Sequence, residues 1–283
     1  MRGPAGPSAE QASEMPEEGV FPLVRDGYDA VYDVLERSPT FAQLWRTNAY
    51  HADFPVEFAH ISFLTLGEAT QLTRRLRLAT GSLLVDAACG AGGPGLWMAR
   101  ESGATLIGID PAEAGLVAAR RLARQSGLGE RARFQLGTFQ HTGVADATAD
   151  AVMTVEALQY APDKRAALIE LRRILRPGGR LGIVCFEVDP GLVLGVPALG
   201  TDPIADYREL LRQCEFTVEV YEETPGWQER VYGAFKALVD AQGALVEEMG
   251  EQAAAAVLAE ATFTIEVRPY PRRILAVARA TPL

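Results

Sequence analysis

Two aspartates frame a glycine-rich segment whose chemistry suits a small charged ligand. The residues Gly90-Ala91-Gly92-Gly93-Pro94-Gly95 match the pattern GxGxxG, and Asp86 stands before them at the end of an apolar run. Asp110 ends the next apolar run. A carboxylate at that place can accept hydrogen bonds from both hydroxyls of a ribose. These positions predict a site for a ribose-bearing ligand beside the loop.

The negative charge of Asp86 indicates which kind of ligand the glycine-rich segment would bind. GxGxxG alone also fits the pyrophosphate of a dinucleotide, so an NAD-type oxidoreductase is one alternative. A buried negative charge at the strand end would repel a pyrophosphate, whereas it would suit a ligand that carries an ammonium group. Asp86 and Asp110 together therefore favour a cationic ligand that has a ribose and no phosphate.

Apolar runs and helical periodicities alternate along the chain, and they predict the elements that position this loop. Tyr28, Val31, Tyr32 and Leu35 share one face of a helix. The expected strands are 82–90, 105–110, 132–137, 151–156, 180–187, 216–223 and 272–280, and the expected helices are 66–78, 94–101, 112–125, 163–175, 204–214 and the block 227–260, with a turn at 176–179. This alternation predicts an open, mostly parallel sheet with helices on both faces, whose last two strands could pair antiparallel.

Four segments resemble, in order and spacing, the motifs of class I S-adenosylmethionine-dependent methyltransferases. They are VDAACGAGGPG, LIGIDPAEAG, DAVMTVEALQYAPD and LRPGGRLGIV. The resemblance covers roughly residues 66–187. The stretch VEALQYAPDKRAALIELRRILRPGG is most similar to the small-molecule branch, which contains sterol and tocopherol C-methyltransferases and natural-product sugar O-methyltransferases. The resemblance implies S-adenosyl-L-methionine as cofactor, a small-molecule acceptor and a role in secondary metabolism.

The resemblance also implies roles for individual residues of the cofactor site. Those expected to bind the cofactor are Asp86, Ala88, Gly90 and Gly92 near its methionine part and sulfonium, Asp110 at the ribose, Pro111, Thr138 and Phe139 at the adenine, and Glu156 beside the transferred methyl group. Two of these positions depart from the family pattern. Ala88 stands where the family has the first glycine of its motif, and Thr138 stands where it usually has an aspartate that contacts adenine.

Methyl transfer to a hydroxyl or an alkene needs a group that takes up a proton. Glu156 and His60 are the catalytic candidates, although Glu156 could instead only orient the cofactor or a nearby backbone group. The candidates for substrate binding are Tyr28, His60, Phe63, Tyr160 and Trp227. Packing in the core or the lid would explain the aromatic candidates equally well.

The fold class that follows is α/β: a Rossmann-like, mostly parallel seven-stranded sheet with an antiparallel last strand, a helical N-terminal segment and a helical lid insertion. Residues 1–19 are expected to be a disordered tail. The single domain 20–283 would then comprise a helical cap (20–80), a cofactor-binding core (81–226), a helical lid (227–262) and the last strand (263–283). A block as long as 227–260 is too long for an ordinary loop, which indicates a lid.

Composition excludes several other classes of protein. The 283 residues carry a net charge of −10, whereas nucleic acid would require a basic stripe. No apolar run approaches the roughly 18 residues that span a bilayer. The three cysteines lack a CxxC pair and the histidines are too scattered for a metal site. We therefore expect a cytoplasmic enzyme without metal, nucleic-acid or membrane partners, which C- or O-methylates an apolar or aromatic-containing metabolite. A non-methylating, cofactor-binding protein of the same fold is the other alternative.

Overall fold

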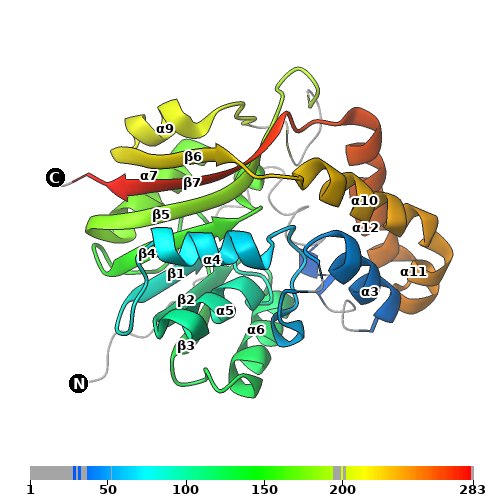
Figure 1. The fold of residues 1–283 in the computed structure, drawn as a ribbon, viewed down its shortest axis with the longest axis horizontal. Helices are drawn as coiled ribbons and strands as arrows, with labels where there is room; N and C mark the ends of the chain where they lie inside the picture. The colour runs from blue at the N-terminus through cyan, green and yellow to red at the C-terminus, as the bar shows by residue number, and fades with distance from the viewer. Residues whose placement is uncertain are drawn as a thin grey trace.

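One seven-stranded sheet forms the centre of the computed structural model, which describes residues 28–29, 31–32, 37–51, 53–193, 199 and 202–281 (Figure 1). The strands are β1 (Leu83–Ala87), β2 (Thr105–Asp110), β3 (Ala132–Leu136), β4 (Ala149–Val155), β5 (Leu175–Glu187), β6 (Phe216–Glu223) and β7 (Arg272–Ala280). Their order in the sheet is β3-β2-β1-β4-β5-β7-β6. The pairs from β3 to β5 are all parallel, and β7 runs antiparallel to both β5 and β6. The predicted fold class is therefore confirmed.

Helices cover both faces of the sheet because successive strand residues point to opposite sides. Leu84 packs in one core with residues of α4 (Leu66–Arg75) and α5 (Gly93–Ser102). Its neighbour Val85 packs in the other core with residues of α7 (Lys164–Ile174) and α9 (Tyr207–Gln213). The helix α6 (Glu113–Gln125) follows β2. These βα units bring the carboxyl ends of β1, β2 and β4 to one edge.

The strand order reverses between β1 and β4, since β2 and β3 continue on one side of β1 and β5 on the other. In open α/β sheets such a reversal opens a crevice outside the carboxyl ends of the strands, and ligands bind there. Asp86 and the glycine-rich loop lie at this point, as the sequence predicts.

A second group of helices stands beyond that edge of the sheet, at the right of Figure 1. It contains α10 (Trp227–Asp240), α11 (Gln242–Met249), α12 (Glu251–Val267) and, from the N-terminal part, α3 (Pro39–Asn48). Glu248 of α11 joins the two parts, because it accepts hydrogen bonds from the Ser38 hydroxyl (2.6 Å) and the Thr40 hydroxyl (2.7 Å). The cap and the lid are therefore in direct contact.

Several element boundaries differ from the prediction. The expected turn 176–179 belongs to β5, where the ladder with β4 is irregular between Ala149 and Ala151 and Gly178 has a φ of +78°. The helix expected at 204–214 begins only after Asp206, whose side chain caps it. The helix α12 ends at Val267, beyond residue 262, where the lid was expected to end. The tail 1–19 lies outside the described residues, and the division into cap, core and lid stays a prediction.

Within the described part of the chain, no helix has both the length and the apolar character needed to cross a membrane.

Candidate functional site

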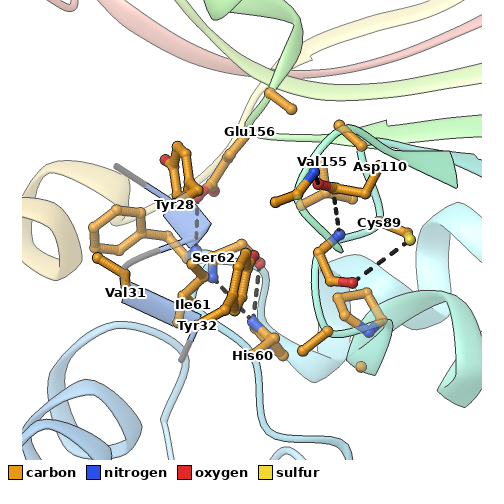
Figure 2. A pocket seen from close by; sticks show the side chains of 18 of the residues that line it. Tyr28, Val31, Tyr32, His60, Ile61, Ser62, Cys89, Asp110, Val155 and Glu156 are labelled. Carbon is orange, nitrogen blue, oxygen red and sulfur yellow. Dashed lines mark hydrogen bonds between the residues drawn. The ribbon is translucent and has the colours of Figure 1, made fainter. Parts of the chain in front are cut away.

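A cavity of about 1050 Å³ lies between the carboxyl edge of the sheet and the lid (Figure 2). Its walls come from the ends of β1, β2 and β4, from the N-terminal segments and from α10 and α12. The predicted site residues that line it are Tyr28, His60, Phe63, Asp86, Ala88, Gly90, Gly92, Asp110, Pro111, Thr138, Phe139, Glu156 and Tyr160. Trp227 does not line it.

The glycine-rich loop turns back on itself through residues with left-handed backbone. Ala88, Gly90 and Gly92 have φ values of +64°, +51° and +79°. Gly92 is also the N-cap of α5, so free backbone amides of that helix point toward the loop. Glycine adopts this backbone without strain, whereas alanine does not. The departure from the family pattern at Ala88 is therefore a strained position at the site.

Asp110 holds the loop in place through both of its carboxylate oxygens. Oδ2 accepts a hydrogen bond from the Gly90 amide (2.7 Å), and Oδ1 accepts one from the Ala112 amide (2.9 Å). The side chain is 7% exposed. Burial raises the pKa of Asp110 to about 6, although these two amides oppose the shift. A carboxylate has further lone pairs, so Asp110 can still accept hydrogen bonds from a ligand.

Asp86 is the more isolated of the two carboxyl groups. It is 2% exposed, and burial, followed by repulsion from Asp110, raises its pKa to about 8. A cation placed beside these two carboxyl groups would oppose both effects, because it stabilises the ionised forms. The electrostatics of the loop therefore fit a cationic ligand and disfavour a phosphate.

Tyr32 was not among the predicted site residues, yet it closes over the loop. A Cβ built on Gly90 would lie 2.1 Å from the Tyr32 hydroxyl oxygen, so only glycine leaves room for this side chain. Asp29, from the same helical turn, accepts a hydrogen bond from the Ala114 amide at the start of α6 (3.1 Å). The sequence indicated the apolar helical face that includes Tyr32, but it did not indicate that this face packs on the glycine-rich loop.

The segment around Phe58 closes the loop from another side and leads to a stability prediction. A Cβ on Gly93 would lie 2.6 Å from the Phe58 carbonyl oxygen and 2.7 Å from that of Ala59.

Because the backbone at Phe58 and Ala59 would have to move, we expect Gly93→Ala to lower the free energy of unfolding by about 1–3 kcal/mol. Urea unfolding measures this. The control is Gly67→Ala in α4, where the nearest atom is 3.9 Å away; it should raise stability by up to about 1 kcal/mol. Equal stabilities of the two variants would contradict the packing seen at Gly93.

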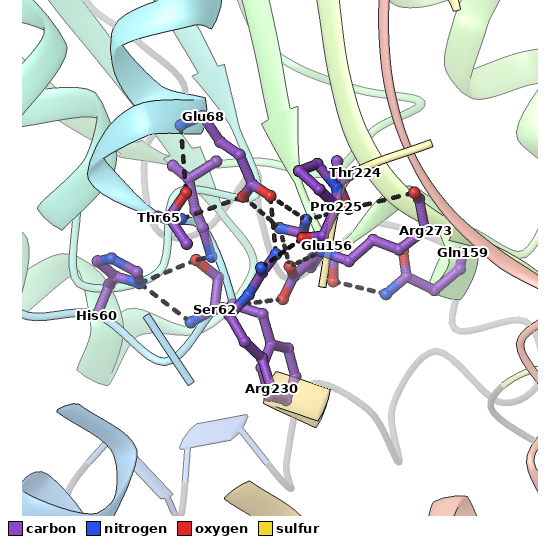
Figure 3. A network of polar contacts seen from close by, with 12 residues as sticks. His60, Ser62, Thr65, Glu68, Glu156, Gln159, Thr224, Pro225, Arg230 and Arg273 are labelled. Atoms are coloured by element: carbon purple, nitrogen blue, oxygen red, sulfur yellow. Dashed lines mark hydrogen bonds and ion pairs between the residues drawn. The ribbon is translucent and has the colours of Figure 1, made fainter. Parts of the chain in front are cut away.

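Glu156 follows β4 with a φ of +52° and is fully engaged by protein groups (Figure 3). Its Oε1 accepts from Arg273 Nε (2.7 Å), and its Oε2 accepts from the Phe63 amide (2.8 Å). Burial raises the pKa of Glu156, against the opposing effect of Arg273. The carboxylate thus holds the N-terminal segment against the sheet, which is the positional role that the sequence left open.

A buried network of two carboxylates and two guanidinium groups continues from Glu156 (Figure 3). Arg273 of β7 is 0% exposed and donates to Glu68 Oε1 (2.9 Å), to Glu68 Oε2 (3.1 Å) and to the Thr224 hydroxyl (2.8 Å). Arg230 of α10 also donates to Glu68 (2.8 Å). Sequence reasoning missed Glu68, Arg230 and Arg273, because charged residues in amphipathic elements are usually solvated.

His60 is half-buried, and its ring centroid lies 4.2 Å from that of Tyr50 and 4.6 Å from that of Phe54. Its Nδ1 accepts from the Ser62 amide (3.3 Å), which places the ring proton on Nε2. Burial lowers its pKa to about 3. A neutral imidazole with Nδ1 engaged and a proton on Nε2 can donate a hydrogen bond, but it is poorly suited to be the base that the sequence suggested.

Trp227 lies behind the cavity wall. It is 2% exposed, its ring centroid is 5.8 Å from that of Phe186, and its indole N–H donates to Glu223 (2.9 Å). Phe186 itself lines the cavity. Trp227 therefore packs behind the cavity wall and does not line the cavity.

Fold and site together define a Rossmann-like α/β protein with a cofactor-type loop under a helical lid. Residues 85–183 match the family model described as a methyltransferase domain. This segment of the chain is accordingly a methyltransferase domain, and it carries the loop, Asp110 and Glu156.

Curated relatives are similar to part of the chain. Methyltransferase GfsG of Streptomyces halstedii is 32% identical over 167 residues, and 27-O-demethylrifamycin SV methyltransferase of Amycolatopsis mediterranei (strain S699) is 31% identical over 164 residues. Each match covers 58% of this chain and 58% of the relative. The chain thus spans less than two thirds of the length of these relatives.

Solved structures resemble the chain in fold. The 4+2 cyclase SpnF matches with a TM-score of 0.69 at 20% identity, over 98% of both chains. Geranyl diphosphate C-methyltransferase of Streptomyces coelicolor A3(2) matches with a TM-score of 0.59 at 18% identity, over 86% of this chain and 98% of that one. At these identities the likeness shows the fold alone.

Proposed function

We propose that the protein transfers the methyl group of S-adenosylmethionine to a small molecule bound in the same cavity. The observation that carries this proposal is the pair of buried carboxyl groups, Asp86 and Asp110, beside the glycine-rich loop of a methyltransferase domain. Asp110 suits a ribose, and Asp86 suits an ammonium group. The names of the relatives, which include methyltransferases of natural products and sterols, support a small-molecule acceptor.

The residues of the chain would act mainly by positioning and by excluding water. When bound, S-adenosylmethionine supplies an activated methyl group on a sulfonium. Asp86 and the loop amides hold its methionine part, and Asp110 holds its ribose. Pro111, Thr138 and Phe139 would flank its adenine. The lid helices and the segment that contains Phe63 close the cavity over the acceptor.

The experiment compares the binding of two ligands and then tests turnover. S-adenosylhomocysteine should raise the melting temperature of the protein, whereas NADH should not. Incubation of S-adenosylmethionine carrying a deuterated methyl group with a panel of hydroxylated macrolactones and sterols should give a methylated product by mass spectrometry. Stabilisation by NADH but not by S-adenosylhomocysteine would support the oxidoreductase alternative and overturn the proposal.

The likeness to the cyclase SpnF supports a second candidate function, a non-methylating activity. The match to the cyclase SpnF extends over 98% of both chains, cap and lid included, and the two predicted bases, Glu156 and His60, are both engaged by protein groups. A non-methylating activity on this fold would leave S-adenosylmethionine unconsumed. Release of S-adenosylhomocysteine with the acceptor panel, measured by chromatography, separates the two functions.

Ligand affinity should depend on pH through Asp86. Its folded pKa of about 8 lies above its ordinary value of 3.8, so the unliganded protein loses stability as the pH rises from about 4 to 8. An ammonium group binds the ionised carboxylate, so binding releases a proton. We expect the Kd of S-adenosylhomocysteine to fall by up to about tenfold per pH unit below pH 8 and then to level off.

Calorimetry in buffers of different ionisation enthalpy measures that proton release directly. The Asp86→Asn variant should bind more weakly and lose the pH dependence. A pH dependence that Asp86→Asn retains would assign the titration to another group.

We also propose a cytoplasmic setting for the protein. Its three cysteines, Cys89, Cys185 and Cys214, are all buried free thiols, which suits a reducing compartment.

A further inference from the structure

Glu260 of α12 is a cavity carboxylate that sequence reasoning did not single out. Its side chain is accessible because it faces the cavity. The Tyr160 hydroxyl donates a hydrogen bond to Glu260 Oε1 (2.9 Å). Desolvation by the cavity walls raises the pKa of Glu260, and no cation among the described residues contributes to its pKa. Glu260 is therefore a cavity carboxyl group that accepts a hydrogen bond from a tyrosine and, among the described residues, has no basic side chain beside it.

The other carboxylates of the cavity have roles that leave Glu260 apart. Glu156 is paired with Arg273, and Glu57 is paired with Arg100 at 2.9 Å. Asp86 and Asp110 lie near the strand ends beside the glycine-rich loop. Glu260 comes from the lid helix α12 and lines the same cavity, so we assign it to the space for the acceptor.

Gln159 presents a second hydrogen-bond acceptor in the same cavity. It is 1% exposed and lines the cavity. Its Nε2 donates to the Glu156 carbonyl oxygen (2.8 Å), which fixes the orientation of the amide (Figure 3). Its Oε1 has no donor among the described residues. Gln159 precedes Tyr160, the hydrogen-bond partner of Glu260, in the short helix η2 (Leu158–Tyr160), so neighbouring residues bring the Gln159 carbonyl and the contact to Glu260 into the same cavity.

Aromatic rings surround this pair of acceptors. The rings of Tyr28 and Tyr160 meet edge to face at 6.4 Å. Tyr270 also lines the cavity, and Glu260 is near enough to raise the pKa of both Tyr28 and Tyr270. Phe263, one helical turn after Glu260, is a further wall residue. A carboxylate set among aromatic faces suits a cation better than a neutral hydroxyl, because both the charge and the ring quadrupoles attract it.

We propose that Glu260, Tyr160 and Gln159 form a subsite that binds a protonated amine of the acceptor. This inference rests on the proposed function, since it assigns the acceptor end of the same cavity. An ammonium group supplies the three donors that the Glu260 carboxylate and the Gln159 carbonyl can share. The amine anchors the acceptor, and the methyl group goes to another atom of the molecule, because a protonated amine has no lone pair to attack with.

The test uses 2-phenylethylamine and its neutral counterpart 2-phenylethanol as probes. Both are titrated calorimetrically near neutral pH into the wild-type protein, with and without S-adenosylhomocysteine. We expect the amine to bind at least about tenfold more tightly than the alcohol, and Glu260→Gln to remove this preference. The control is Glu251→Gln, which changes an exposed carboxylate of the same helix outside the cavity and should keep it.

The outcomes separate this inference from the proposed function. Equal binding of the two probes, binding of neither, or an amine preference that Glu260→Gln retains would overturn the amine subsite. In each of those cases, tight binding of S-adenosylhomocysteine would leave the proposed function standing. Glu260→Gln should bind S-adenosylhomocysteine as the wild type does, which also shows that the variant is folded.

Discussion

Replacing Arg273 with methionine should lower the free energy of unfolding by about 3–5 kcal/mol, the cost of leaving buried charges without their partner. Arg273 is completely buried and donates hydrogen bonds to both Glu68 and Glu156. Methionine fills much of the same space but supplies no donor. Arg230 would still compensate Glu68, so the uncompensated charge falls chiefly on Glu156.

The matched control lies on the same strand. Arg279 pairs with Glu219 at 3.0 Å, but both side chains are about one third exposed (34% and 30%), so Arg279→Met should cost about 1 kcal/mol or less. Urea unfolding measures both variants. Adding Glu156→Gln to Arg273→Met should recover part of the loss, since it removes the orphaned charge. If Arg273→Met and Arg279→Met cost the same, the buried network does not stabilise the fold as described.

Asp110→Asn should weaken the binding of S-adenosylhomocysteine by roughly 30- to 1000-fold, which corresponds to about 2–4 kcal/mol. The two oxygens of Asp110 receive the Gly90 and Ala112 amides, and the ribose would share them. Asparagine has one acceptor oxygen, so one loop amide loses its partner, and the charge that strengthens hydrogen bonds to the ribose disappears.

Calorimetric titration of the folded variant tests this expectation, with circular dichroism to confirm its fold. Asp146→Asn is the control, because Asp146 lies on the surface in an ion pair with Arg173. Affinity within threefold of the wild type for Asp110→Asn would remove Asp110 from the ligand site, whatever the effect on stability.

The placement of the glycine-rich loop between two aspartates could be predicted from the sequence because it depends on local patterns. Asp86 and Asp110 each end a short apolar run, and parallel strands bring their carboxyl ends to one edge. The glycines between them mark the turn. These signals require no knowledge of long-range packing.

The buried charge network and the position of Glu260 could not be predicted in the same way. Glu68 and Arg273 are 205 residues apart, and no local pattern distinguishes a buried charged pair from two solvated residues. Trp227 is a residue that was expected at the cavity but lies in the core. An aromatic residue at the start of a helix can face either one, and the packing of α10 decides which. Glu260 lies in an alanine-rich helix with little amphipathic pattern, which hid its cavity-facing position.

The place of β7 in the sheet has a consequence for the order of folding. This strand is the last of the seven in sequence, yet it lies between β5 and β6 and carries Arg273 to the centre of the molecule. During synthesis, β6 has no strand partner and Glu156 no counter-ion until the ribosome has released residues 272–280. The sheet is therefore completed late, and the partly made chain exposes an open sheet edge of the kind that chaperones protect.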